Sequence, residues 1–277
     1  MTIYGKIKER EGHMNRLFLR ERDEQHPPLV AEKIKIGVAG MCQGAGVTVI
    51  GTTLAKIASK NIQGRVKFLE IAEPLRHKPM LFDSLGMDKR FAGRDFFEFY
   101  SAVSEGRPIR GKVNIDEGIS WALITNSDLK KCVSLTREEK IHLINNTSCD
   151  ILVCDINCNT SDSNNADQWE ALVNEMDLII FVIDPMPSRL LAGFSLLNRA
   201  KALEEKGKKI VWVINKFNDG INKKECLEYL RIKIFGTIPL VQQEKFYTSE
   251  YNCRLPYHLK ELHLPLAELA KKHEIFT

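Results

Sequence analysis

KIKIGVAGMCQGAGVTVIGTTLAKIA, residues 33–58, joins an apolar run, a short glycine-bearing segment and an amphipathic run that begins near Val47. The first part has the composition of a buried strand and the last part has helical spacing. Gly40, Gly44 and Gly46 let the backbone between them turn tightly, and the N-terminus of a helix offers free N–H groups and the positive end of a dipole. The order of strand, turn and helix predicts a phosphate-binding loop. A purely structural turn is the alternative.

The composition around this segment is that of a globular protein. The 277 residues are 44% hydrophobic and 27% charged, and they suffice for one large α/β domain, although the length also permits two small ones. The formal net charge of +4 is too small over this length to indicate nucleic-acid binding. Composition therefore gives no strong nucleic-acid signal.

The sequence carries no pattern of secretion or membrane insertion. No apolar run follows the basic residues at the N-terminus, and the longest apolar stretches have the length of strands. The seven cysteines are an odd number and do not form a loop-rich framework, so we expect reduced thiols. We predict a cytoplasmic protein with no transmembrane segment.

The chain divides into a charged N-terminal extension, residues 1–32, and one domain, residues 33–277. The extension ends near Pro27 and Pro28, which cannot continue a helix. From Lys33 onward, β-branched runs alternate with helical stretches, which predicts a single α/β domain with a doubly wound, mainly parallel sheet flanked by helices. The expected strands are Ile34–Ala39, Val66–Ile71, Ile119–Ile124, Ile151–Asp155, Leu178–Ile183, Ile210–Asn215 and Thr237–Ile238. The expected helices are Val47–Ser59, Phe96–Ser104, Arg137–Asn145, Gln168–Glu175, Leu190–Glu205 and Lys223–Lys233.

The glycine-bearing segment resembles the deviant Walker A loop of the ParA/MinD family, P-loop ATPases of the SIMIBI class whose pattern is K-G-G-x-G-K-[ST]. The residues that fall on this pattern, in order, are Cys42, Gln43, Gly44, Ala45, Gly46, Val47 and Thr48, and Val49 follows them. Both lysines of the pattern are thus absent. In the family, the second lysine pairs with β and γ phosphate oxygens, and the first reaches across a dimer to the partner's nucleotide.

The resemblance implies that ATP or ADP binds along this loop together with Mg²⁺. Backbone amides from Gly44 to Thr48 can hold a diphosphate whatever the side chains are, and the Thr48 hydroxyl is placed to meet Mg²⁺. The missing charges remove transition-state stabilisation worth about 10²-fold or more in rate. We therefore expect nucleotide binding with little or no hydrolysis and assign no catalytic residue.

Two further strands resemble the acidic motifs of the family. In GRVKFLEIAEPLR, Glu70 matches the first acid, but Ala72 stands where an aspartate would position water. Glu73 is an alternative if the loop shifts, and a solvated strand end is an equal interpretation of both glutamates. In CDILVCDINCN, Asp155 ends a buried strand as in a Walker B motif and would hold Mg²⁺. The polar segment INCNTSDSNNADQ then occupies the switch II position.

The adenine-binding side of the family is represented by two positions. KKIVWVINKF resembles the strand whose terminal asparagine reads adenine, which assigns that role to Asn215. Pro239, in the segment Gly236-Thr237-Ile238-Pro239, resembles the turn after which the base-contacting loop begins. The resemblance spans about residues 33–272 and fails chiefly at the catalytic side chains.

Degenerate phosphate loops with a leading extension resemble the TadZ/CpaE branch, which positions pilus machinery. This implies a homodimeric positioning scaffold with a protein partner from pilus or secretion machinery, either free in the cytoplasm or peripheral at the inner membrane or cell pole. Without a lysine at position 42, such a dimer should not need ATP. The alternative function is an active ATPase that partitions or sorts DNA or a membrane-associated cargo.

The C-terminal tail, HLKELHLPLAELAKKHEIF, has leucines at helical spacing: Leu259, Leu262, Leu266 and Leu269. Such a stripe could target a membrane or could dock onto the domain. Pro265 and a weakly basic polar face favour docking.

Overall fold

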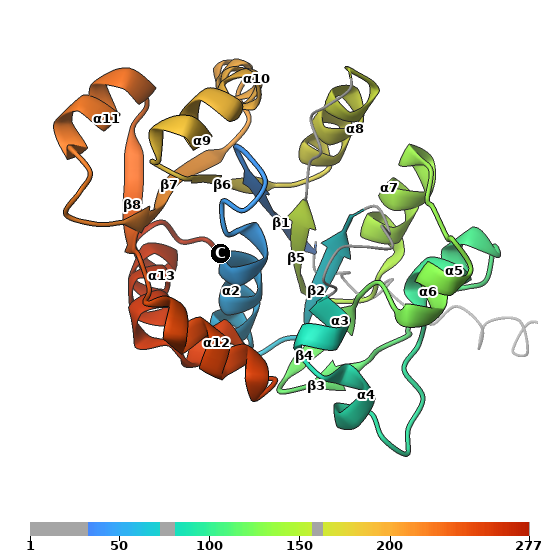
Figure 1. The fold of residues 1–277 in the computed structure, drawn as a ribbon. Helices are drawn as coiled ribbons and strands as arrows, with labels where there is room; N and C mark the ends of the chain where they lie inside the picture. The colour runs from blue at the N-terminus through green and yellow to red at the C-terminus, as the bar shows by residue number, and fades with distance from the viewer. Residues whose placement is uncertain (1–32, 73–80, 157–162, 277) are drawn as a thin grey trace, which may run out of the picture. The chain divides into compact units, whose positions relative to one another are not determined.

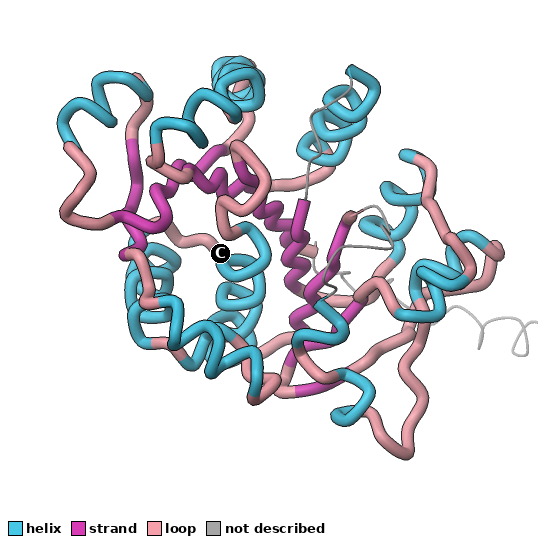
Figure 2. The backbone as a smooth tube through the Cα atoms, viewed as in Figure 1, coloured by secondary structure: helices cyan, strands magenta, loops and turns pink. Residues whose placement is uncertain are grey.

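The computed structural model describes residues 33–72, 81–156 and 163–276. The predicted N-terminal extension, Glu73 and residues 157–162 of the predicted switch II segment lie outside the described residues. Figure 1 shows the domain as a ribbon, and Figure 2 shows the strands as a continuous row between layers of helices. The predicted α/β architecture is confirmed.

Within the described residues, eight strands form one sheet in the order β3-β4-β2-β5-β1-β6-β7-β8. Every neighbouring pair is parallel except β3 and β4. The strands are β1 (Ile34–Gly40), β2 (Val66–Ile71), β3 (Ile115–Asp116), β4 (Ile119–Ala122), β5 (Ile151–Ile156), β6 (Leu178–Ile183), β7 (Ile210–Phe217) and β8 (Ile234–Pro239). Since the chain leaves β1 towards β2 on one side and later places β6 on the other, the end of β1 is a topological switch point, where ligands bind in open α/β sheets.

Helices cover both faces of this sheet. The helix α2 (Val47–Asn61) packs against β1, β2 and β5, and α13 (Lys260–Lys272) packs beside it against β8. The helices α7, α8 and α10 lie over the opposite face (Figure 1). The remaining bounds are α3 (Leu81–Ser84), α4 (Met87–Arg90), α5 (Phe99–Ser104), α6 (Asn126–Lys130), α7 (Arg137–Asn146), α8 (Ser163–Asn174), α9 (Pro187–Ala192), α10 (Phe194–Glu205), α11 (Lys223–Leu230) and α12 (Gln243–Tyr251).

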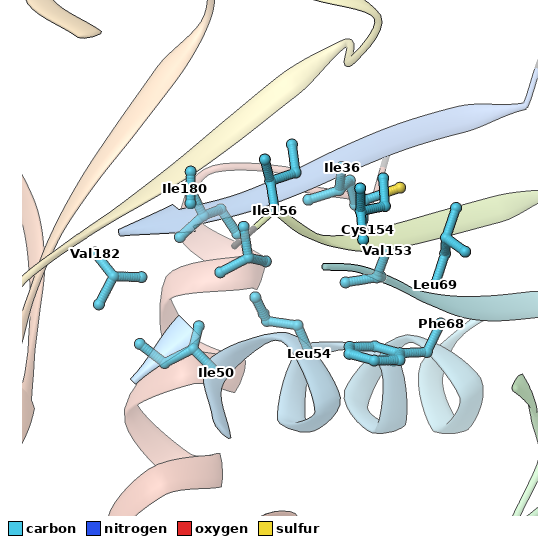
Figure 3. Close-up of a cluster of buried hydrophobic side chains, with 14 of the residues drawn as sticks. Ile36, Ile50, Leu54, Phe68, Leu69, Val153, Cys154, Ile156, Ile180 and Val182 are labelled. Atoms are coloured by element: carbon cyan, nitrogen blue, oxygen red, sulfur yellow. The ribbon is translucent and has the colours of Figure 1, made fainter. Parts of the chain in front are cut away.

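The central strands are apolar along their whole length because both of their faces are covered. Every residue of β5 and β6 is buried. Figure 3 shows Ile50 and Leu54 rising from α2 towards the sheet, with Phe68 of β2 beside Leu54. All three side chains are fully excluded from solvent. This packing fixes the first turns of α2 against the sheet, close to the end of β1.

The single helix predicted over Leu190–Glu205 is wrong, because the structure has two helices that meet at Gly193. A Cβ atom at Gly193 would lie 2.5 Å from the backbone oxygen of Met41. The chain therefore bends at the one residue that lets it come this close to the end of β1. The bend brings α9 next to the glycine-bearing loop.

Other bounds also differ from the predicted ones. The helix α8 begins at Ser163, five residues before the expected Gln168, and β7 continues two residues beyond Asn215. The helix α12 was not expected, since its mixed sequence lacks a clear apolar stripe and buries only Ser249.

The tail helix α13 docks on the domain in this structure. Leu262, Leu266 and Leu269 are at most 5% exposed and lie against α2 and β8. Leu264, on the opposite side of the same helix, is 57% exposed. The leucine stripe is thus part of the domain core.

We predict that Leu266→Ala lowers the free energy of unfolding by about 2–5 kcal/mol, because it removes a fully buried side chain and leaves a cavity. Leu264→Ala is the matched control and should change it by less than about 0.5 kcal/mol. Urea denaturation followed by circular dichroism measures both. Equal stability of the two variants would show that α13 is not docked in solution.

Candidate functional site

The loop that connects β1 to α2 has the backbone of an anion-binding turn. Gly44 and Gly46 have φ angles of 79° and 101°, a region that favours glycine. Gly46 is the N-cap residue of α2 and provides no side-chain acceptor for the first N–H groups of the helix. These amides therefore remain available to a ligand at the positive end of the helix dipole.

Asn215 supports the loop from the end of β7. Its Nδ2 donates a hydrogen bond of 2.8 Å to the backbone oxygen of Ala45, and the residue is only 5% exposed. A Cβ atom at Gly46 would lie 2.2 Å from the same Nδ2. The residue predicted to read adenine therefore meets the loop backbone directly, and only glycine fits between them.

Lys216, the next residue, forms a second contact with the loop, which the family pattern does not predict. Its Nζ donates to the backbone oxygen of Gly44 at 2.6 Å and to Asp184 Oδ2 at 2.8 Å. Its φ angle of 57° is unusual for a residue with a side chain. Asp184 follows the last residue of β6 and is buried. The sequence signal for this contact is Asp184 itself, an acidic residue directly after the apolar strand β6.

Arg189 of α9 reaches the loop from the other side. Its Nη1 donates to the backbone oxygen of Gln43 at 3.2 Å. No sequence pattern predicts this contact, because it depends on the bend at Gly193 that carries α9 against Met41. Cations from two separate elements thus lie on consecutive carbonyl groups of the loop.

The two positions that carry lysine in the family pattern hold uncharged side chains. A Cβ atom at Gly40 would lie 2.6 Å from Val47 Cγ2, so the isopropyl group folds back over the start of the loop. At the other position, burial and the nearby Asp184 raise the pKa of the Cys42 thiol. The thiol is therefore protonated at neutral pH, and neither side chain contributes positive charge.

Thr48 and Asp155 meet where a divalent cation could bind. The Thr48 hydroxyl donates to Asp155 Oδ2 at 2.5 Å. Asp155 is 2% exposed, and its Oδ1 has no hydrogen-bond partner among the described residues. Burial raises the pKa of Asp155 to about 6, partly offset by the Thr48 hydroxyl. The buried carboxylate and hydroxyl oxygens are ligands of the kind that Mg²⁺ prefers.

Glu70 lies beside Asp155, since the two residues are register partners on β2 and β5. Glu70 Oε2 accepts a hydrogen bond of 3.1 Å from the Ile124 amide. Desolvation and the neighbouring Asp155 raise the pKa of Glu70 to about 8. Ala72, directly after β2, donates its N–H to the Tyr100 hydroxyl at 3.4 Å. Of the two predicted positions on this segment, only Glu70 therefore brings a carboxyl group to the site.

Pro239 lies at the end of β8, next to the strand that carries Asn215. It is the register partner of Phe217, and the Leu240 amide donates to the Phe217 oxygen at 2.8 Å. The structure thus places Pro239 and Asn215 at the carboxyl ends of neighbouring strands.

A cavity of about 170 Å³ opens beside the first turn of α2, next to Thr48 and Val49. Its other walls come from α3 and α12 and from the chain after α12. The lining residues are Thr48, Val49, Thr52, Leu81, Ser84, Leu85, Phe246, Ser249, Glu250, Arg254 and Pro256. Thr48 lines this cavity, so the space adjoins the predicted metal and phosphate positions, whereas neither Asn215 nor Pro239 lines it.

The sequence matches no known family model and no curated protein. Solved structures of similar fold include the MinC:MinD cell division protein complex of Aquifex aeolicus, with a TM-score of 0.63 and 13% identity over 87% of this chain and 95% of that chain. The cell division ATPase MinD of Pyrococcus furiosus gives a TM-score of 0.64 and 12% identity over 88% of this chain and 99% of that one. A putative plasmid partition protein of Borrelia burgdorferi B31 bound to AMPPNP gives a TM-score of 0.62 and 15% identity over 87% of this chain and 100% of that chain. The domain therefore has the fold of MinD and ParA P-loop ATPases.

No helix in the described part of the chain is both long and apolar enough to cross a membrane.

The two left-handed glycines of the loop give a matched test of its geometry. Gly44→Ala should cost about 1–2 kcal/mol of stability from backbone strain alone, because the new Cβ atom would meet nothing closer than 4.0 Å. Gly46→Ala should cost several kcal/mol, because the Cβ atom also collides with the Asn215 amide. Urea denaturation of both variants measures the difference. Equal losses would contradict the close contact between the loop and β7.

Proposed function

We propose that this protein binds ATP or ADP with Mg²⁺ at a degenerate, deviant Walker A loop and hydrolyses it little or not at all. Its role would be that of a ParA/MinD-type positioning or scaffold protein, with pilus or secretion machinery as the partner system. The observation that carries the proposal is the loop itself, whose left-handed glycines leave the first amides of α2 uncapped.

The Mg²⁺ part of the proposal rests on the orphaned oxygen of Asp155. A buried carboxylate oxygen without a donor is unfavourable, and a bound cation would satisfy it. Thr48 already lies on the other oxygen of the same carboxylate and would contribute its hydroxyl as a second ligand. Thr48 and Asp155 would hold Mg²⁺ at this place, and the ion would supply positive charge beside the phosphates.

Slow hydrolysis is expected because the groups that stabilise the transition state are missing. Val47 brings an isopropyl group to the loop where the family pattern has an ammonium group. Ala72 has no side chain that can orient water, and its amide is directed to Tyr100. Each such loss reduces the rate by about 10²-fold or more.

The second candidate function is an ATPase that partitions or sorts DNA or a membrane-associated cargo. The carboxyl group of Glu70 beside Asp155 favours it, because a cation held at Asp155 would lower the raised pKa of Glu70, and the resulting carboxylate could then act on water. Phosphate release that DNA or lipid vesicles stimulate would support this candidate over the scaffold.

We predict that calorimetry detects binding of ATP and ADP in the presence of Mg²⁺ and that phosphate release stays near background. EDTA should weaken nucleotide binding by the wild type, because it removes Mg²⁺. Thr48→Val should weaken nucleotide binding about tenfold in the presence of Mg²⁺ and make it insensitive to EDTA, because the substitution removes a metal ligand. Thr48→Ser, which keeps the hydroxyl, is the control. Thr48→Phe should fill the loop and abolish binding.

Restoring a positive charge at position 47 should raise the affinity for nucleotide without raising the rate of hydrolysis. Val47→Lys should tighten binding without turnover, and Val47→Lys with Ala72→Asp is the smallest combination expected to restore turnover. Robust hydrolysis by the wild type would overturn the weak-hydrolysis proposal. Failure of the wild type to bind any nucleotide would leave the fold as a scaffold alone.

We also propose that the protein forms a homodimer through the face that carries the loop. Three large apolar side chains are exposed next to Arg189: Met186 (58%), Leu191 (72%) and Phe194 (45%). A second copy would cover them, since exposed apolar clusters commonly mark interaction surfaces. Because Cys42 cannot make an ionic contact with a partner's phosphate, association should not depend on nucleotide.

Sedimentation velocity tests this assembly. The wild type should show the same association state with and without ATP and Mg²⁺. Leu191→Glu should weaken association, whereas Leu264→Glu on the exposed side of α13 should not. A monomer-to-dimer transition on adding ATP would contradict the nucleotide-independent dimer.

A further inference from the structure

Two cations lie against the loop that itself carries no lysine. Arg189 Nη1 bonds the Gln43 oxygen at 3.2 Å, and Lys216 Nζ bonds the Gly44 oxygen at 2.6 Å. A donor on a carbonyl group fixes the orientation of that peptide unit. Both contacts hold loop oxygens towards the cations, which helps leave the neighbouring N–H groups free for an anion.

The two cations differ in how much of their charge is free. Lys216 pairs at 2.8 Å with Asp184, whose side chain is only 6% exposed, so this carboxylate neutralises most of the lysine's field. Arg189 is exposed, and no carboxylate lies within ion-pair distance of it among the described residues. Its guanidinium group has donors beyond the one that bonds Gln43. Arg189 is therefore the uncompensated positive charge at the loop.

The position of Arg189 does not depend on its own hydrogen bond. Pro187 begins α9, and Gly193 ends it in contact with the backbone of Met41. The helix is thus anchored at its C-terminal end by packing against the residue that follows β1. The arginine Nη2 lies 4.0 Å from the place where a Cβ atom of Gly44 would be, over the middle of the loop.

We propose that Arg189 supplies positive charge from α9 to the phosphates of the bound nucleotide, in place of the lysines that the loop lacks. Lys216, locked between Gly44 and Asp184, is a positioning residue that keeps the loop in shape. This inference rests on the proposed nucleotide binding. It adds a ligand-contacting residue on an element outside the loop sequence.

The test compares nucleotide affinity among variants at Arg189 by calorimetry with ATP and with ADP in the presence of Mg²⁺. Arg189→Gln keeps a hydrogen-bond donor but removes the charge, and it should weaken ATP binding about fivefold at low salt. Arg189→Lys should retain most of the affinity. Arg110→Gln, an exposed arginine between α5 and β3, is the matched control and should behave as the wild type.

Salt and stability separate a charge effect from a structural one. The difference between wild type and Arg189→Gln should shrink in 0.5 M NaCl, because salt screens exposed charges. The melting temperature without nucleotide should be the same for all four proteins. An affinity of Arg189→Gln within twofold of the wild type, or an equal loss in Arg189→Lys, would overturn the inference.

The outcome also distinguishes this inference from the proposed function. If the wild type binds nucleotide and Arg189→Gln binds it equally well, Arg189 does not supply charge to the phosphates, and the proposed nucleotide binding stands. If the wild type binds neither ATP nor ADP, the proposed function fails, and the role of Arg189 fails with it.

Discussion

The buried contact between Asn215 and the loop backbone is the constraint on which the site depends. The amide of Asn215 bonds the Ala45 oxygen and lies under Gly46, so the end of β7 fixes the shape of the turn before α2. From below, Ile50 and Leu54 fix α2 against the sheet. The loop conformation is therefore set by backbone and amide contacts that need no lysine.

Positive charge at this loop comes from the surrounding strands and helices. Lys216 and Arg189 reach it from β7 and α9, and Asp184 neutralises the first but not the second. On the other side, Asp155 Oδ1 is buried and has no hydrogen-bond partner in the described part of the chain, while Oδ2 of the same carboxylate accepts from the Thr48 hydroxyl. An anion in the loop and a cation at Asp155 would each compensate the other, so their binding should be coupled.

The sequence predicted the order of the main strands and helices well, because parallel strands covered on both faces are continuously apolar. Glycine or polar residues such as Gly40, Asp155 and Asn215 lie at or near the ends of these strands. The sequence also placed Thr48 and Asp155, which the structure brings into contact. It did not predict the bend at Gly193, the helix α12 or the roles of Lys216 and Arg189. Each of these depends on a contact between distant segments, such as Gly193 against Met41, and no local periodicity encodes such a contact.

Hydrogen exchange measured by mass spectrometry on peptides that cover residues 43–50, with and without ADP and Mg²⁺, tests the central claim most directly. If backbone amides hold the phosphates, exchange at the loop and the first turn of α2 should slow on binding, and it should slow equally in a Cys42→Ala variant. Nucleotide binding without any protection of these amides would contradict a phosphate site built from the loop backbone.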